Sequence, residues 1–330
     1  MKGILTLTII TQRASSLNYG ENIGNVSILK KLSLEDNSQI TYVSDKALKY
    51  EMRKAGKEQF GWKLLDEKVR DLVGSSKKGK KLDVDEFGKA LIRDYHEFDL
   101  FGGLLTNLKG ADDEKVELSY GDSIKRTAPV KITYAYSISK FQGDMDFMNN
   151  IDAYNRYIKH LEQKDAQVIA QSEQHSAHYY YTIAIDLDRI GVWEGENQSV
   201  DLIPPEGKAN RVKTLLDIVR TLSRQIRGRW ENLSPIFVIG GIYKIKNPFF
   251  MGCIGAKETE DGKLILDTAR LLDCKKLIPE GERENTLCGI LSGYFANEQE
   301  VREKLECKSV GEVFEELKKK VEEVYAVSKT

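Results

Sequence analysis

The sequence has little net charge and no long apolar run. Its 50 Lys and Arg side chains are balanced by 51 Asp and Glu, so the formal net charge is −1. Bulk charge therefore does not attract nucleic acid, and any such attraction must be local. No apolar segment approaches the length of a membrane span, and MKGILTLTIITQRASS at the start lacks the apolar block of a signal peptide. We expect a globular protein without a membrane partner, located in the cytoplasm.

Cysteine is also scarce. The four cysteines are far apart and form no C-x-x-C pair: Cys253, Cys274, Cys288 and Cys307. This spacing suggests neither a zinc site nor a disulfide framework, and it agrees with a reducing compartment. We expect no metal and no cofactor.

Known catalytic motifs are missing. GSSKKGKK (74–81) approaches a phosphate-binding P-loop, but Lys81 replaces the hydroxyl residue that binds Mg²⁺, and the preceding segment has a helical pattern. His175 and His178 form an H-x-x-H pair near Glu173, yet no further ligands accompany them. A structural role explains this pair better than a metal site.

Hydrophobic periodicity predicts the order β-α-β-β-α-β. The strands are expected at 3–11, 127–140, 178–191 and 234–245, and the helices at 44–56 and 207–229. A further helix begins at Ser309 with a capping box to Glu312. This order is that of ferredoxin-like domains, including RNA-recognition motifs (RRM), and it predicts an α+β fold with large insertions after the first helix and the second strand.

The predicted strands have one apolar and one small-residue face. The second strand should bury a row of apolar side chains, Val130, Ile132, Tyr134, Tyr136 and Ile138. The opposite sheet face would carry small residues such as Thr8 and Thr182. RRM domains that read bases place stacking aromatic residues on that face, and no such motif is evident. Bound RNA would therefore be held by its backbone.

TYVSDKALKYEMRKAG (41–56) predicts a short helix with one basic side. Ser44 is a favourable N-cap, Asp45 suits the first turn, and Gly56 supplies a stop. Spacings of three and four residues place four cations on one side, Lys46, Lys49, Arg53 and Lys57. Asp45 and Glu51 lie off this line, so the like charges repel unless an anion neutralises them. A solvated surface helix is the alternative.

Four segments, in order, resemble the DevR-type backbone subunit of type I CRISPR Cascade complexes, closest to subtype I-B. They read IITQRASSLNYGENIGN, TYVSDKALKYEMRKAG, RTAPVKITYAYSISKFQGDMDF and HSAHYYYTIAIDLDRIG. The resemblance covers most of residues 1–245 and implies a hand-shaped protein. Its parts would be an RRM-like palm (1–57, 127–139 and 178–245), fingers (58–126), a thumb (140–177) and a C-terminal extension of the palm (246–330).

The resemblance also implies a function. Copies of such a subunit stack along the spacer of a CRISPR RNA (crRNA) and present it to target DNA, so that base pairing supplies the sequence specificity. Implied partners are crRNA, target DNA, further copies of this chain, a capping subunit, a large subunit and an RNA-processing endonuclease. The implied RNA-binding residues are Arg13, Ser16, Asn18, Ser44, Lys46, Lys49, Arg53, Arg126 and Arg229.

Catalysis is not expected. Related type III backbone subunits cut RNA with a loop aspartate, whereas Ser27 lies near the matching position here. Glu35 and Asp36 are the nearest acids in that loop. We therefore expect a non-enzymatic subunit. The alternatives are a metal-dependent ribonuclease that uses those acids, and an RNA-binding regulator outside any complex.

Overall fold

A single large sheet forms the centre of the protein. The computed structural model describes residues 1–65, 83–106, 123–149, 156–157, 169–195 and 199–326. Eight strands follow one another in the order β21-β20-β17-β1-β12-β9-β5-β4, and β8 also pairs with β12. Their bounds, in chain order, are β1 Ile4–Ser15, β4 Lys31–Ser33, β5 Gln39–Val43, β8 Val130–Ile132, β9 Ala135–Ser137, β12 Ser176–Asp186, β17 Pro235–Tyr243, β20 Leu287–Ile290 and β21 Lys308–Ser309.

The expected β-α-β-β-α-β order is present. Helix α1 (Asp45–Phe60) follows β1, and α6 (Pro205–Arg220) connects β12 to β17. The strand pairs β1–β12 and β1–β17 are antiparallel, and β12 pairs antiparallel with both β8 and β9. The mixed α/β class is therefore confirmed, whereas a detailed likeness to RRM domains stays a prediction.

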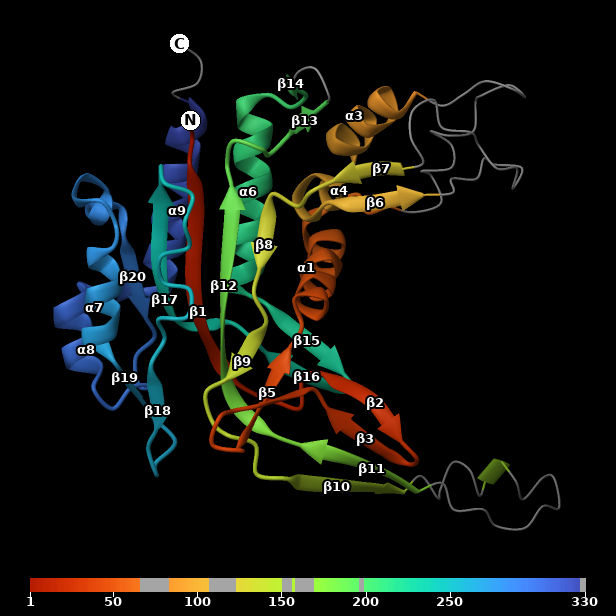
Figure 1. Ribbon diagram of the computed structural model, residues 1–330, viewed down its shortest axis with the longest axis vertical. Helices are drawn as coiled ribbons and strands as arrows, with labels where there is room; N and C mark the ends of the chain where they lie inside the picture. Colours follow the sequence, from red (N-terminus) through yellow and green to blue (C-terminus); the bar gives the residue numbers. More distant parts are fainter. Residues whose placement is uncertain (66–82, 107–122, 150–155, 158–168, 196–198, 327–330) are drawn as a thin grey trace.

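Three helices cover one face of this sheet (Figure 1). These are α1, α6 and α9 (Val310–Ala326), and their apolar sides share one core with alternate residues of β1 and β12. Leu7, Ile9 and Ile183 lie in this core with no exposed surface. The capping box of α9 is present, since Glu312 accepts hydrogen bonds from Ser309.

Both predicted palm helices end at other residues than expected. Helix α1 continues past Gly56 to Phe60, and Gly61 ends it in the left-handed region with φ 66°. Helix α6 ends at Arg220, and a hairpin of β15 (Ser223–Ile226) and β16 (Arg229–Asn232) follows. The two turn residues, Arg227 and Gly228, both have positive φ, which is the geometry of a tight hairpin turn.

A one-residue irregularity divides the predicted second strand into β8 and β9. Ile132 lies opposite Ile183, and Tyr136 lies opposite Tyr180. The β8–β9 segment therefore advances four residues where β12 advances three. Such a bulge reverses the alternation of side chains. Consequently Tyr134 is 41% exposed, and the prediction that one strand face buries this whole row is wrong.

The segment after β1, expected as a loop, forms strands. Strands β2 (Tyr19–Ile23) and β3 (Val26–Leu29) join a second sheet in the order β10-β11-β3-β2. Strands β10 (Asp144–Asn149) and β11 (Ile169–Gln174) come from the predicted thumb. Part of the predicted palm thus pairs with the thumb, and the division into palm, fingers and thumb stays a prediction.

The predicted fingers contain helices and a hairpin, which are α3 (Val84–Asp94), α4 (His96–Phe101), β6 (Gly103–Thr106) and β7 (Ser123–Arg126). The P-loop-like segment 74–81 lies outside the described residues. Asp99 of α4 joins the fingers to the palm, because its buried carboxylate lies 2.6 Å from both Arg126 and Arg211.

The C-terminal residues form a layer on the other face of the sheet. It contains β18 (Ala256–Glu258), β19 (Leu264–Leu266), α7 (Thr268–Lys276), the 3-10 helix η1 (Glu280–Asn285) and α8 (Glu298–Leu305). Residues of β19, α7 and α8 form a second core with Ile10 and Phe237. Thr8 and Thr182, predicted on an open face, are buried and 2.9 Å apart. A short hairpin, β13 (Val192–Glu194) and β14 (Ser199–Asp201), completes the described strands.

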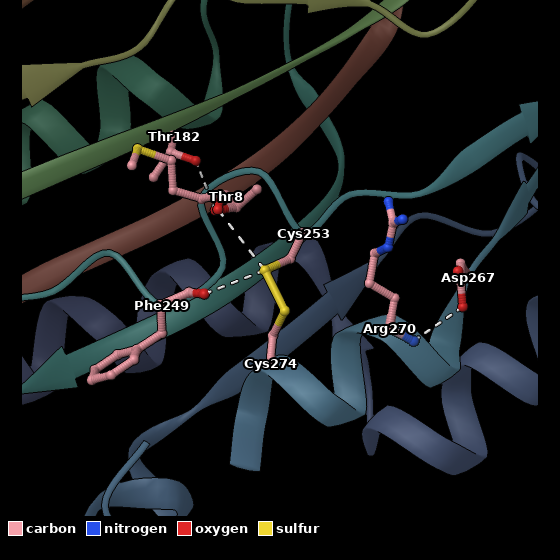
Figure 2. The surroundings of a disulfide bond; sticks show 8 residues. Thr8, Thr182, Phe249, Cys253, Asp267, Arg270 and Cys274 are labelled. Atoms are coloured by element: carbon pink, nitrogen blue, oxygen red, sulfur yellow. Dashed lines mark hydrogen bonds between the residues drawn. A yellow bond between two sulfur atoms is a disulfide. The ribbon is translucent and has the colours of Figure 1, made fainter. Parts of the chain in front are cut away.

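Two disulfides correct the expectation for the cysteines. Cys253 is bonded to Cys274, and Cys288 to Cys307, with Cα atoms 6.8 and 4.6 Å apart. Figure 2 shows the first bond, which joins the loop after β17 to α7. The pairs are 21 and 19 residues apart in sequence, so spacing alone did not reveal them. None of the helices in the described ranges has the length and apolar character to cross a membrane.

Candidate nucleic-acid interface

The outward side of α1 carries the four predicted cations. Ser44 accepts a hydrogen bond from the backbone nitrogen of Ala47 at 3.3 Å and so begins the helix. Leu48 and Met52 fix the other side in the core. The remaining side therefore faces outward and presents what we call the basic stripe, namely Lys46, Lys49, Arg53 and Lys57.

Acids of the chain neutralise half of the basic stripe. Lys49 lies 3.1 Å from Asp45, one turn earlier, and Arg53 lies 3.1 Å from Glu97 of α4. The expectation that no acid pairs with these cations is therefore wrong. The other two cations are exposed and pair with no carboxylate among the described residues. Partly exposed ion pairs contribute only about 0–1 kcal/mol, so a phosphate can displace them.

A buried ion pair holds α1 in place from beneath. Arg224 of β15 donates to Glu51 at 2.8 Å and to the backbone oxygen of Leu17 at 2.8 Å. Burial raises the pKa of Glu51, and the charge of Arg224 opposes that shift. The hairpin thus links the helix to the segment after β1. The sequence places Arg224 inside a helix and gives no signal for this role.

The predicted polar residues near the end of β1 separate into two groups. Asn18 donates to the hydroxyl of Ser44 at 3.2 Å, which places both at the start of α1. Ser16 donates to Gln174 at 2.7 Å, and Arg229 donates to the same amide oxygen at 3.2 Å. Ser16 is completely buried, so its hydroxyl presents no surface to a ligand.

Two predicted arginines lie away from the basic stripe. The Arg126 side chain is 2% exposed and bound to Asp99, so it is not available to RNA in this structure, which corrects its place in the predicted set. Arg13 donates to the backbone oxygen of Ser176 at 3.0 Å and forms an ion pair with Glu258 of β18. The structure therefore brings Asn18, Ser44 and the basic stripe together, and Arg13 lies elsewhere.

The β15–β16 hairpin adds side chains that the sequence analysis missed. The Arg227 guanidinium lies over the ring of Tyr19, 3.8 Å from its centroid. Lys54 of α1 donates to Gln225 at 2.9 Å, and Trp230 is 71% exposed. The sequence signal that could have revealed this hairpin is the Arg-Gly pair before Arg229, which fits a hairpin turn as well as a helix end.

A second missed feature lies on the sheet face opposite α1. Four tyrosines contact one another there and form what we call the tyrosine row, namely Tyr42, Tyr134, Tyr136 and Tyr180. This face therefore carries contacting aromatic residues, although no RNP-type motif is evident in the sequence. The bulge between β8 and β9 is the reason, because it turns two of these rings outward.

No group of three or more potential metal ligands occurs among the described residues. His175 Nδ1 lies 2.7 Å from the Thr41 hydroxyl, and His178 Nδ1 lies 2.9 Å from the backbone oxygen of Thr11. Burial lowers the pKa of both histidines. Their contacts are those of buried structural side chains.

Ser27 and the two loop acids considered for catalysis, Glu35 and Asp36, have different surroundings. Ser27, on β3, donates to Asn22 at 2.9 Å. Asp36 accepts a hydrogen bond from Lys140 at 2.5 Å, and this bond lowers the pKa of Asp36. Glu35 is exposed in the same turn. The absence of nuclease activity stays a prediction.

Chains of solved structures share this fold. A chain of a "CRISPR RNA-guided surveillance complex, pre-nicking" aligns with a TM-score of 0.54 and 14% identity, covering 98% of this chain and 99% of that chain. A chain of a "CRISPR RNA-guided surveillance complex" aligns with a TM-score of 0.50, at the same identity and coverage. At this identity the likeness defines the fold class alone.

Sequence comparison defines the family. The family model described as "CRISPR-associated negative auto-regulator DevR/Csa2" matches residues 6–259, and this chain belongs to that family. The predicted resemblance to DevR proteins is therefore confirmed, whereas the subtype stays a prediction. No curated protein sequence matches the chain.

Proposed function

We propose that this chain is a repeated backbone subunit of a type I CRISPR surveillance complex, close to subtype I-B. The basic stripe of α1 binds phosphates of the crRNA, with Asn18 and Ser44 beside its first turn. Family membership and the shared fold support this role. The single observation that carries it is an outward row of cations on a helix fixed from behind.

The electrostatics of α1 suit a polyanion. The two paired cations are held by partly exposed carboxylates, and these bonds cost little to exchange. Phosphates spaced along an RNA strand can instead bind four cations at once and release counterions, which strengthens binding at low salt. No base-reading group is required, because the guide sequence is read by pairing with target DNA.

The proposal includes the partners that such a role requires. These are crRNA, target DNA, other copies of this chain, a capping subunit, a large subunit and an RNA-processing endonuclease, all in the cytoplasm. The chain itself catalyses nothing in this proposal. Cleavage of complementary RNA by the assembled complex, abolished by Asp36→Ala, would contradict that part.

Co-expression with the neighbouring genes and a CRISPR array tests the proposal. The wild-type chain should copurify with a discrete RNA that contains spacer sequence, in a particle with several copies of this chain. Lys49→Glu with Arg53→Glu should lower RNA retention by roughly 100-fold or more, because two contacts become repulsions. The fold should remain intact, since neither residue lies in the core.

Lys275→Glu with Lys276→Glu is the matched control. These residues lie on α7, on the other face of the sheet, and the double variant has the same change in charge. It should retain RNA as the wild type does. Equal RNA retention by both double variants would show that the basic stripe is not the RNA site.

The family description also favours a second candidate. It names a negative auto-regulator, which suggests an RNA-binding regulator outside any complex. A monomer that binds the leader of its own messenger RNA, and that acquires no crRNA when array and partner genes are present, would support this alternative and contradict the first.

A further inference from the structure

The tyrosine row crosses three neighbouring strands. Tyr136 of β9 lies directly opposite both Tyr42 of β5 and Tyr180 of β12. The rings of Tyr136 and Tyr180 are 5.9 Å apart. Tyr134, in the link between β8 and β9, stacks on Tyr42 at 5.1 Å with an interplanar angle of 16°. The rings thus form one continuous aromatic surface.

The C-terminal layer leaves the Tyr134 end of this surface uncovered. Its core covers β20, β17 and part of β1, and it ends at Tyr180 and Ile138, which are partly buried against it. Beyond that edge no described element covers Tyr134, whose ring is stacked on Tyr42 and is 41% exposed. The outer ring of this stack is therefore available to a further planar group.

Cations without acidic partners flank the row. Lys131 is exposed on β8 opposite Ala184. Ala184 and Tyr180 are an even number of residues apart on β12, so Lys131 lies on the same face of the sheet as Tyr180. Arg270 of α7 is close enough to Tyr180 to influence its ionisation. In Figure 2 the only hydrogen bond marked for Arg270 comes from its backbone nitrogen to Asp267. Neither side chain forms an ion pair with a described carboxylate.

We propose that the tyrosine row is a binding site for a single-stranded nucleic acid, separate from the crRNA site on α1. Bases stack on Tyr134 and its neighbours, and Lys131 and Arg270 neutralise adjacent phosphates. Every base has a flat aromatic face, so such a surface binds without sequence preference. The site lies on the opposite face of the sheet from α1, so the strand it takes is a second one and not the guide.

The combination of groups favours nucleic acid over a protein partner. An apolar protein interface would use a closed patch of packed side chains with few unpaired charges at its centre. Here the most exposed ring is a stacked one, and two cations that form no ion pair with a described carboxylate, Lys131 and Arg270, lie on the same side of the sheet as the row. A platform of stacking rings combined with cations that contact the backbone is the usual composition of surfaces that bind single strands.

The test uses the full chain with Lys49→Glu and Arg53→Glu, so that α1 does not contribute. Binding of a fluorescent 15-nucleotide poly(dT) is followed by anisotropy. Tyr134→Leu should weaken binding about fivefold or more, the loss expected for one stacked base, whereas Tyr134→Phe should keep it. Lys131→Gln should lower the slope of log affinity against log salt by about 0.7.

Photocrosslinking supplies an independent readout. An oligonucleotide with 5-iodouracil should crosslink to the tryptic peptide ITYAYSISK, residues 132–140, which contains Tyr134 and Tyr136. Unchanged affinity in Tyr134→Leu, or crosslinks confined to other peptides, would overturn the proposal. A variant that binds poly(dT) normally but loses self-association in sedimentation would assign the surface to a second copy instead. Failure of the crRNA proposal would not alter these outcomes.

Discussion

The fingers segment and the C-terminal layer are attached to the same sheet by different means. The fingers meet the palm through apolar contacts of α3 and α4 and through a buried charge cluster, since Asp99 lies 2.6 Å from Arg126 and from Arg211 and also accepts from the backbone nitrogen of Gly191. The C-terminal layer shares an apolar core with the sheet and contains two disulfides. Both joints bury apolar side chains; the fingers joint adds a buried charge cluster, and the C-terminal joint adds covalent bonds.

This difference has a functional consequence for α1. Glu97 of the same short helix as Asp99 pairs with Arg53, and the ring of His96 stacks on Trp62 at 5.8 Å. The charged joint therefore adjoins the candidate crRNA site, whereas the C-terminal layer borders the tyrosine row. Changes in the fingers should affect the first site, and changes in the C-terminal layer the second.

Removing the central acid of the charged joint should have the largest effect on stability. Asp99→Ala leaves two guanidinium groups buried without their carboxylate, so we expect a loss of about 3–5 kcal/mol in the free energy of unfolding. Denaturant titration measures this loss. Asp94→Ala removes a partly exposed partner of the exposed Arg93 in the same segment and should cost under about 1 kcal/mol. Equal losses in the two variants would contradict the central role of Asp99.

Opening a single disulfide should have the next largest effect on stability. Each bond closes a loop of about twenty residues, so opening one should cost about 2–4 kcal/mol. Thermal unfolding of the wild type, beside variants in which one cysteine pair at a time is replaced by alanine, measures the cost of each bond. Four free thiols in protein purified without reductant would show that the bonds do not form.

A smaller, pH-dependent effect should come from His96. Burial lowers its pKa from 6.5 to about 4; Arg211 and Lys63 act in the same direction, and Asp99 opposes them. As the pH falls, His96 is protonated in the unfolded chain before it is protonated in the folded one. Protonation therefore favours the unfolded state, and the free energy of unfolding falls between about pH 6.5 and 4. His96→Gln should reduce the fall in unfolding free energy between pH 7 and 5. His175 and His178 shift in the same direction and should leave a residual slope.

Local patterns in the sequence predicted much of the fold and part of the candidate site. The β-α-β-β-α-β order, the capping box at Ser309 and the outward direction of Lys49 and Arg53 depend on residues within a few positions of one another. Periodicities of two and 3.6 residues express such relations directly. The ends of α1 and α6 were predicted less well, because a Gly or an Arg-Gly pair is compatible with more than one way of ending or continuing a helix.

Long-range contacts were not predictable in the same way. The acid that pairs with Arg53 lies 44 positions along the chain (97 − 53), and the carboxylate that removes Arg126 from the candidate site lies on another helix. The cysteine pairs likewise meet only after folding. Each of these depends on which segments the topology places side by side.

The sequence by itself therefore determined the order of the palm strands and helices and which side of α1, α6 and α9 faces the core. It also determined the family, through the ordered segments of residues 6–259. Tertiary structure decided which cations remain exposed and which are buried with a partner. It also decided that a single bulge turns Tyr134 and Tyr136 to the open face, because the phase of a strand is set by its pairing with β12 and not by its own composition.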